Sequence, residues 1–298
     1  MDAEALQFEA PAKVNLSLRV KGLDASRMHP LLSLVQSFDR CDRLNAALAD
    51  EDELEIGAGE LSPGRDNLIW RAIDGLRAET GNQRPFSFSL DKQIPIAAGL
   101  AGGSADAAAA LVAAATLLDV SRSTIMEVAV GVGADVPFCI QGGFAWMEGH
   151  GDRLTAIRPA PTDYAIAVVV PPFALETAAV YRRWDELGEP SGGAVEARHL
   201  PPSLRQFGLI ANDLYPAALD LRSELGDWQA ELVDRWERPV MLSGSGPSLF
   251  AYFEDRVDAA EAAGLGPAEA RARFATSPVP FGARLIAEPD SQAVGRSH

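Results

Sequence analysis

Two segments of the 298-residue chain have residue types that suit phosphate binding. The run Gly99-Leu-Ala-Gly-Gly-Ser104 precedes an alanine-rich stretch that is expected to be a helix. Glycines let a ligand approach the backbone closely, and the free amides at a helix N-terminus attract anions. The run has neither the Gly-Lys-Ser/Thr of a Walker A loop nor the GxGxxG spacing. It is a candidate phosphate cradle, although a packing loop with Ser104 as helix N-cap fits the same residues.

Farther along, the run Ser243-Gly-Ser-Gly-Pro-Ser248 has more turn residues than a hairpin needs, which favours a ligand-facing loop over a plain turn.

Asp135 is the candidate for proton transfer, and Lys13 is a second charged residue to consider. Asp135 lies between Gly133 and Pro137, where an acid is commonly a turn or capping residue. An aspartate there can also accept a proton from an attacking hydroxyl. Lys13 lies on the polar side of an alternating segment, so by itself it is expected to be a solvated lysine.

Period-2 and period-3.6 patterns give the elements that position these residues. A half-buried strand is expected at 8–20, with Val14 and Leu16 facing inward and Lys13 and Asn15 outward. Further strands are expected at 86–90, 165–170, 240–242 and 249–253, and helices at 67–79, 104–118 and 123–130. Because strands and helices alternate without a regular βαβ rhythm, the pattern favours an α+β fold.

The composition changes to proline, alanine and threonine at 159–163, which predicts a domain boundary there. We therefore expect an N-terminal domain at 1–160 and a C-terminal domain at 161–298. The last residues, 288–298, are expected to be disordered.

The bulk composition restricts the functional classes. A net charge of −16 argues against a broad nucleic-acid surface, which needs clustered basic residues. Neither a secretory signal nor a membrane span is visible. With only Cys41 and Cys139 and no CxxC pair, the chain suits a reducing cytoplasm. The four histidines have no metal-ligand spacing.

Taken together and in this order, three segments resemble the motifs of the GHMP kinases. They are Pro11-Ala-Lys-Val-Asn-Leu16, Pro95 to Asp106, and Leu242 to Leu249. The chain is most similar to the diphosphocytidyl-methylerythritol kinase subfamily, which has further counterparts of Asp66-Asn-Leu68, Ala98 to Ala108, Gly133 to Pro137, Asn212-Asp-Leu214, and Thr177 with Tyr181. These landmarks extend over residues 10 to 253.

The resemblance implies a fold and a reaction. It implies a two-domain GHMP kinase fold, with an N-terminal domain like ribosomal protein S5 domain 2, a ferredoxin-like C-terminal domain and a cleft between them. The implied reaction transfers a phosphoryl group from ATP, with Mg²⁺, to the 2-hydroxyl of a cytidine diphosphate-linked alcohol in the non-mevalonate isoprenoid precursor pathway. The expected protein is a cytoplasmic monomer or homodimer with a small-molecule substrate.

The resemblance also implies roles for individual residues. Asp135 is the expected catalytic base, and Lys13 holds the hydroxyl or the γ-phosphate. Asn67 and Lys92 are expected near the nucleotide base or ribose, and Ser104 is a candidate magnesium contact. The other residues expected to bind ATP are Pro95, Ala97, Ala98, Gly99, Leu100, Ala101, Gly102, Gly103 and Ala105. The residues expected to bind the acceptor are Asn15, Met28, His29, Thr177, Tyr181 and Gly244.

One segment departs from the family pattern. The family has Asp-Gly-Tyr-His after the first strand, where the tyrosine stacks on cytosine, whereas this chain has Asp24-Ala-Ser-Arg-Met-His29. Met28 therefore occupies the place of the tyrosine, and a thioether can still pack against a ring. Tyr181 would supply the other face. The departure leaves open a homoserine, mevalonate-type or sugar kinase. A catalytically silent GHMP-fold protein is disfavoured, because Lys13, Asp135 and the glycines are present.

Overall fold

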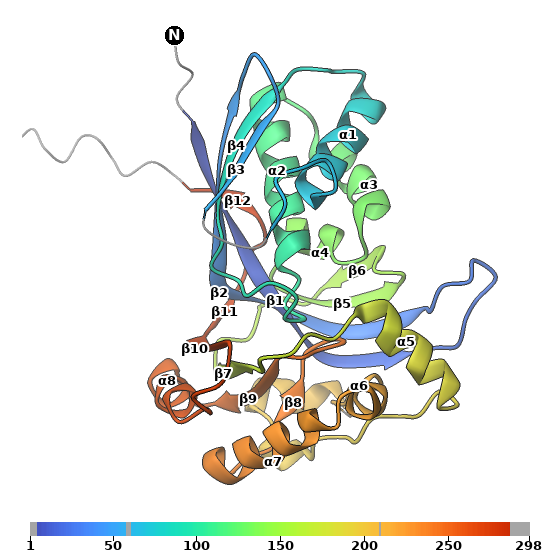
Figure 1. Ribbon diagram of the computed structural model, residues 1–298, viewed down its shortest axis with the longest axis vertical. Helices are drawn as coiled ribbons and strands as arrows, with labels where there is room; N and C mark the ends of the chain where they lie inside the picture. Colours follow the sequence, from blue (N-terminus) through green and yellow to red (C-terminus); the bar gives the residue numbers. More distant parts are fainter. Residues whose placement is uncertain (1–4, 58–60, 209, 287–298) are drawn as a thin grey trace, which may run out of the picture.

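The computed structural model describes residues 5–57, 61–208 and 210–286. In this part of the chain, an eight-stranded and a four-stranded sheet each carry helices, so the expected α+β class is confirmed. Figure 1 shows the first sheet with its helices in the upper part of the molecule and the second in the lower part. No helix among the described residues is long and apolar enough to span a bilayer.

The first sheet is organised around two long antiparallel strands, β1 and β2. Its main path runs β12-β1-β2-β4-β3, and β5, β6 and β11 join it through β2 and β5. The strands are β1 (Leu6–Val20), β2 (Leu31–Leu48), β3 (Glu53–Ile56), β4 (Phe86–Asp91), β5 (Phe144–Gly149), β6 (Arg153–Ala156), β11 (Pro278–Val279) and β12 (Arg284–Leu285).

Four helices cover one face of this sheet (Figure 1). They are α1 (Leu68–Thr80), α2 (Gly102–Leu118), α3 (Arg122–Val132) and α4 (Val136–Gln141). Helix α2 is the central one, and it packs on α1, β1, α4 and β2. Its alanines from Ala107 to Ala110 are completely buried. Small side chains let the helix lie close to its neighbours on several sides, which fixes the position of its N-terminus.

The second sheet has the order β10-β7-β9-β8. Its strands are β7 (Ala165–Val170), β8 (Met241–Leu242), β9 (Leu249–Phe253) and β10 (Ala272–Thr276). Its helices are α5 (Thr177–Glu186), α6 (Tyr215–Leu221), α7 (Glu224–Trp236) and α8 (Arg256–Gly264), with 3₁₀ turns at Ala197–His199 and Pro202–Phe207. A second buried cluster forms here and includes Leu18 and Val20 of β1.

The two parts are joined along the end of β1. The backbone N–H of Leu18 donates to the Ala211 carbonyl at 2.8 Å, and Asp213 N–H donates back to Leu18 O at 2.9 Å. The Asp213 carboxylate accepts from Arg19 at 2.9 Å and from the Val20 amide at 3.1 Å. The Asn212-Asp-Leu214 segment therefore fixes the second part against β1.

The expected helices and strands are present, with two differences, and further elements (β2, β3, β5, β6, β10 to β12 and α4 to α8) were not anticipated. Helix α2 begins at Gly102 rather than Ser104, so Ser104 lies in its first turn and is not the N-cap. The polar side of β1 is buried and not solvated, since Lys13, Asn15 and Ser17 are each at most 5% exposed. Long β2 was not anticipated, because its polar and apolar residues do not alternate cleanly.

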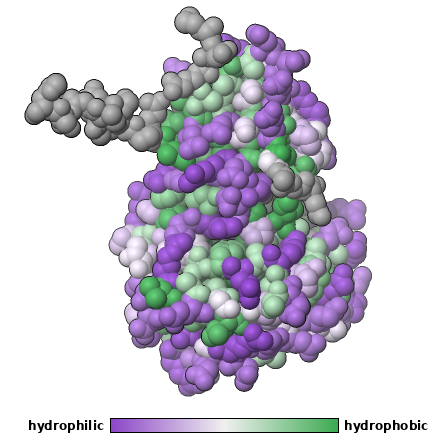
Figure 2. All heavy atoms as spheres, turned by 60° about the vertical axis from the view of Figure 1, so that its left-hand side comes forward, coloured by the Kyte–Doolittle hydropathy of each residue, from purple (hydrophilic) through white to green (hydrophobic). Residues whose placement is uncertain are grey.

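The domain division near residue 160 stays a prediction. Strands β11 and β12, from the expected C-terminal domain, pair with β2 and β1 of the first sheet. The tail at 288–298 lies outside the described residues. The face in Figure 2 is mainly hydrophilic, with smaller hydrophobic patches.

Candidate active site

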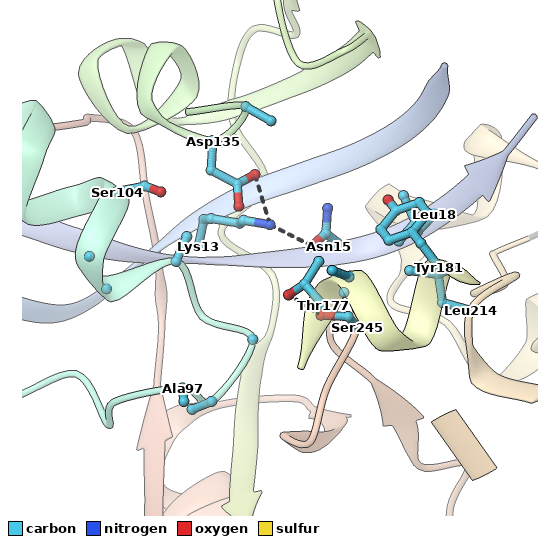
Figure 3. Close-up of a pocket in the computed structure, with 18 of the residues that line it drawn as sticks. Lys13, Asn15, Leu18, Ala97, Ser104, Asp135, Thr177, Tyr181, Leu214 and Ser245 are labelled. Carbon is cyan, nitrogen blue, oxygen red and sulfur yellow. Dashed lines mark hydrogen bonds and ion pairs between the residues drawn. The ribbon is translucent and has the colours of Figure 1, made fainter. Parts of the chain in front are cut away.

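A cavity of about 750 Å³ lies where the two parts of the molecule meet. Its walls come from β1, the β1–β2 turn, the loop before α2, the residues before α4, helix α5 and the loop between β8 and β9. Figure 3 shows Lys13 of β1, Asp135 before α4, Thr177 of α5 and Ser245 gathered around the cavity. Its lining residues extend from Lys13 to Ser245, so only folding brings them together.

Lys13 and Asp135 form an ion pair at the wall of the cavity. The Lys13 ammonium lies 3.1 Å from Asp135 Oδ1 and donates to Asn15 Oδ1 at 2.6 Å. The Lys13 side chain is 5% exposed, whereas that of Asp135 is 30% exposed. Figure 3 shows the two side chains pointing toward each other, with Asn15 beside them. Asp135 is therefore accessible to a ligand. The buried Lys13 ammonium fixes the position of the Asp135 carboxylate.

The local structure frees Asp135 for this contact. Asp135 stands at the N-cap position of α4, but its side chain makes no capping hydrogen bond. Asn67, Ser121 and Asp255, in contrast, cap α1, α3 and α8 with their side chains. Asp135 therefore lies in the turn that the sequence predicts, but its side chain does not cap α4 and is free to pair with Lys13.

Asn15 is oriented by a short chain of hydrogen bonds. Its Nδ2 donates to Ser33 Oγ at 2.7 Å, and Ser33 Oγ donates to Ser17 O at 2.6 Å. Asn15 Oδ1 is thereby directed at Lys13. All of these groups are buried, so the ammonium is held by neighbours that have few alternative partners.

We call residues 95–104 the glycine loop. Its last residue before α2, Ala101, has φ of 57°, and the helix has no side-chain cap. The amides of Gly102, Gly103 and Ser104 have no acceptor among the described residues. These three residues line the cavity, so a row of donors at a helix N-terminus faces it. Such a row suits an anionic group such as phosphate.

Residues 243–248, the serine-glycine loop, hold the glycine loop in place. Ser248 Oγ donates to Ala98 O at 2.5 Å, and Ser243 Oγ donates to Gly99 O at 3.0 Å. A Cβ on Gly99, whose φ is 76°, would lie 2.6 Å from the Ser243 carbonyl oxygen. Asn212 in turn donates to Gly244 O at 2.7 Å. The excess of turn residues at 243–248 therefore serves close contact between two loops. The two loops form the glycine-loop end of the cavity.

The turn at 24–29, together with α5, forms the opposite, or turn, end of the cavity. His29 stacks on Tyr181 of α5 with ring centroids 5.2 Å apart. His29 Nδ1 donates to Lys21 O at 3.0 Å, and Nε2 lies 3.3 Å from Asp185. Met28 is 49% exposed and lines the cavity. An aromatic pair beside a flexible thioether suits a flat, partly apolar ligand group.

Lys92 is close to the glycine loop, but its ammonium is already paired. It contacts Asp42 and lies 2.6 Å from Asp106 Oδ2. Burial raises the pKa of Asp106 well above its usual value, and nearby Asp42 adds to this rise against the opposing effect of Lys92. Burial alone would lower the pKa of Lys92, but Asp106 and Asp42 outweigh it and the net direction is upward. This cluster ties α2 to β2 and β4.

The structure brings most of the expected site residues to the cavity. Those that line it are Lys13, Asn15, Met28, His29, Lys92, Pro95, Ala97, Ala98, Gly99, Ala101, Gly102, Gly103, Ser104, Asp135, Thr177, Tyr181 and Gly244. Leu100 and Ala105 do not line it, because their side chains are buried in the core. Asn67 does not line it either, since it caps α1 and donates to Ser62 O at 2.9 Å. The binding roles of these three residues stay predictions.

Several lining residues were not foreseen. They are Leu18, Arg27, Leu31, Leu61, Leu68, Ile96, Ala134, Met147, His150, Ala178, Leu214 and Ser245. Ser245 and Ala134 belong to segments that the sequence predicts to be functional, so the sequence could have predicted that they line the cavity. Arg27 also belongs to such a segment, the Asp24–His29 stretch that departs from the family pattern, whereas His150 belongs to a turn with no distinctive pattern and only the fold places it at the cavity.

The cavity offers oxygen ligands for a magnesium ion, but the described residues do not supply a complete coordination shell. Among the described residues, no group of three or more histidine, cysteine, aspartate or glutamate side chains could hold a metal ion. Asp135 and Ser104 line the cavity and offer two hard oxygen ligands. Mg²⁺ commonly takes one or two protein oxygens together with substrate phosphates, so this set fits an ion that enters with the nucleotide.

Comparisons with known proteins identify the family. Residues 67–143 match the model of the GHMP kinases N terminal domain. The chain is 35% identical over 276 residues to 4-diphosphocytidyl-2-C-methyl-D-erythritol kinase of Geobacter sulfurreducens, covering 91% of this chain and 98% of that one. It is 37% identical over 273 residues to the enzyme of the same name from Synechococcus, with coverage of 84% and 88%.

Comparison with solved structures supports the same family as the sequence comparisons. A crystal structure of 4-(cytidine 5'-diphospho)-2C-methyl-D-erythritol kinase superposes with a TM-score of 0.76 at 30% identity, over 92% of this chain and 99% of that one. Homoserine kinase from Cytophaga hutchinsonii superposes with a TM-score of 0.67 at 19% identity, over 96% and 98%, which shows a shared fold only. The chain is a small-molecule kinase with the GHMP fold, and it belongs to the 4-diphosphocytidyl-2-C-methyl-D-erythritol kinase family.

Proposed function

We propose that this kinase transfers the γ-phosphoryl group of ATP to the 2-hydroxyl of 4-diphosphocytidyl-2-C-methyl-D-erythritol, in the non-mevalonate isoprenoid precursor pathway. The observation that carries the proposal is the Lys13–Asp135 pair, which lies in one cavity with an anion-binding helix terminus and an aromatic pair. The relatives named above, which match nearly the whole chain, support the choice of acceptor.

In this proposal Asp135 is the catalytic base. Its partly exposed carboxylate accepts the proton of the acceptor hydroxyl as the oxygen attacks the γ-phosphorus. Lys13, held by Asn15, orients the Asp135 carboxylate and stabilises negative charge on the transferring group. Phosphoryl transfer depends mainly on positioning and charge stabilisation, which this rigid pair can supply.

The glycine-loop end is the proposed site of the triphosphate. The amides of Gly102, Gly103 and Ser104 donate to phosphate oxygens, and the glycines leave room for close approach. Bound Mg²⁺ neutralises phosphate charge, and Ser104 and Asp135 are the residues that would hold it. Figure 3 shows Ser104 and Asp135 on the same side of the cavity.

The turn end is the proposed site of the cytosine base. Tyr181 supplies one flat face and Met28 takes the place of a second ring. His29, which stacks on Tyr181, is held by Lys21 O and Asp185. Homoserine, mevalonate-type and sugar kinases remain alternative readings only because Met28 replaces the family tyrosine.

We also propose a cytoplasmic location for the enzyme. Cys41 and Cys139 are both unpaired thiols. Burial raises the pKa of Cys41 to about 12, so it stays protonated and unreactive.

The decisive experiment measures ADP release by the purified protein with ATP and Mg²⁺ across an acceptor panel. The panel contains 4-diphosphocytidyl-2-C-methyl-D-erythritol, homoserine, mevalonate and galactose. We expect turnover of the cytidine compound alone. Turnover of another alcohol, without the cytidine compound, would overturn the proposed acceptor while leaving the kinase family intact.

A further inference from the structure

Arg27 lies at the mouth of the turn end. It lines the cavity next to Met28 and His29, and its side chain is exposed. Its φ of 59° is in the left-handed region, which glycine adopts freely and other residues adopt rarely. A large charged residue thus occupies a backbone position that glycine would occupy with less strain.

The turn that carries Arg27 is well ordered by its own hydrogen bonds. Asp24 Oδ1 accepts from the amide and hydroxyl of Ser26, at 2.8 and 2.5 Å. The Arg27 amide donates to Asp24 O at 2.9 Å, and Asp24 N–H donates to Met28 O at 3.0 Å. The direction in which the turn presents its side chains is therefore largely fixed before a ligand binds.

The turn is also anchored on both sides of the cavity. Asp24 Oδ2 lies 3.0 Å from His150 Nε2, which ties the turn to the segment after β5. His29 ties it to Tyr181 and Asp185 of α5. Arg27 lies between these two attachments in the chain, so it is held near the opening of the cavity.

The charges around the cavity leave Arg27 as the available cation. Its lining contains the cations Lys13, Arg27 and Lys92. Lys13 is paired with Asp135, and Lys92 with Asp42 and Asp106. Among the described residues, no side chain forms an ion pair or hydrogen bond with the Arg27 guanidinium. A polyanionic ligand that enters this protein of net charge −16 needs such a cation.

The order of groups in the acceptor fits this position. In a nucleoside diphosphate-linked alcohol, the diphosphate lies between the base and the alcohol. Met28 and His29, at the proposed base site, directly follow Arg27 in the chain, and Asp135, at the proposed hydroxyl site, lines the same cavity. The glycine loop offers its own backbone donors to ATP and so does not require Arg27.

We propose that Arg27 is a further substrate-binding residue, whose guanidinium pairs with the diphosphate of the acceptor. This inference rests on the proposed function, since it assumes an acceptor with a nucleoside diphosphate. Arginine presents a planar fork of donors that matches phosphate oxygens, so it contributes affinity and excludes acceptors without the diphosphate.

Steady-state kinetics of Arg27→Gly test the proposal. Glycine suits the φ of 59°, so this variant removes the guanidinium while relieving backbone strain, and it is expected to fold. We expect the KM of the cytidine acceptor to rise about tenfold, with kcat and the KM of ATP within about twofold of wild type. Arg27→Lys is expected to recover part of the loss. An unchanged acceptor KM, or a rise confined to ATP, would overturn the proposal.

Binding of CDP and cytidine separates the diphosphate from the base. By calorimetry, Arg27→Gly is expected to weaken CDP about tenfold and to leave cytidine within about twofold of wild type. The CDP difference should shrink in about 0.5 M salt, because an exposed ion pair is screened. Equal weakening of both ligands would mean that Arg27 acts on the base or on the turn, against the proposal.

Turnover by the wild type distinguishes a failure of the Arg27 role from a failure of the proposed function. If wild type phosphorylates the cytidine acceptor and Arg27→Gly behaves like it, only the role of Arg27 fails. If wild type does not use that acceptor, the proposed function fails and the role of Arg27 fails with it.

Discussion

The two ends of the cavity differ in what they present to a ligand. The glycine-loop end offers backbone amides, and its small residues are packed against the serine-glycine loop. The turn end offers side chains, from His29, Met28, Arg27 and Tyr181. Backbone donors suit a group common to the whole family, the phosphates of ATP. Side chains can be exchanged without rebuilding the fold, so the turn end is where acceptor choice can change.

The Lys13–Asp135 pair belongs to neither end, and its loss is expected to have the largest effect. Asp135→Asn should lower kcat by a factor on the order of 10² to 10⁴, because the base is lost. ATP binding should persist, since the glycine loop is untouched. Rapid-quench or steady-state ADP assays measure the first effect, and calorimetry with an ATP analogue measures the second.

Asp119→Asn is the matched control. Asp119 is exposed, follows α2 in a left-handed conformation that asparagine tolerates, and has no side-chain partner among the described residues. It should retain wild-type kinetics. Near-normal turnover by Asp135→Asn would remove Asp135 from the catalytic role.

Gly99→Ala tests whether the glycine-loop end depends on backbone geometry. The added Cβ would lie 2.6 Å from Ser243 O at a φ of 76°. The KM of ATP should rise at least about tenfold, and the free energy of unfolding should fall by about 1–3 kcal/mol. Kinetics and urea unfolding measure the two changes.

Gly131→Ala is the control for that experiment, because the same substitution is made where there is free space. Gly131 lies within α3, and its added Cβ meets nothing within 4 Å. This variant should be more stable by up to about 1 kcal/mol, with unchanged kinetics. If both glycine variants bind ATP normally, the glycine loop is not the nucleotide site.

Met28→Tyr tests whether the turn end can be changed independently. Met28 is 49% exposed at the cavity, so a ring has room. Aromatic stacking contributes about 0.5–1.5 kcal/mol, which corresponds to an acceptor KM lower by about two- to tenfold. The KM of ATP should not move. A parallel change in both KM values would show that the two ends are coupled, and that the turn end does not change independently of the glycine-loop end.

The last expected effect is on stability alone and concerns the support beneath the glycine-loop end. Burial raises the pKa of Asp106, so the folded chain keeps a proton that the unfolded chain loses near pH 3.8. Its contribution to stability is therefore complete below pH 3.8 and declines as pH rises toward the folded-state pKa. Relative to Asp106→Asn, the unfolding free energy of wild type should fall with pH, by at most about 1.4 kcal/mol per pH unit.

Urea unfolding at several pH values between 4.5 and 7 measures this slope by tryptophan fluorescence. The Asp119→Asn variant again serves as the control, because its carboxylate is exposed. A wild-type minus Asp106→Asn difference that does not vary with pH would show that Asp106 titrates normally in the folded chain.

The local elements were predictable from the sequence because their signals are local. Asn67, Ser121 and the Gly81 and Gly133 stops define α1 and α3 within a residue or two of the expected bounds. The alternating residues of β1 and the apolar run of β7 identified strands. The start of α2 was missed by two residues, because Ala101 takes a left-handed conformation without a side-chain cap.

The sequence could not show that the polar side of β1 is buried. Lys13 and Asn15 look like solvated residues because alternation reveals two sides but not what covers them. The covering elements, α4 with Asp135 and the loop with Gly244, come from residues about 120 and 230 positions later.

By itself, the sequence determined strands β1, β4, β7, β8 and β9, helices α1, α2 and α3, the glycine loop and the residue types for phosphoryl transfer, because each depends on neighbouring residues or on a recognisable run. Only the tertiary structure decided that Lys13 pairs with Asp135 and not with solvent, that Asn67 and the Lys92 ammonium are occupied by other partners, and that Arg27 lies at the cavity without a side-chain partner among the described residues. The physical reason is that charge pairing and burial depend on contacts between distant segments, which form when the two sheets close around β1.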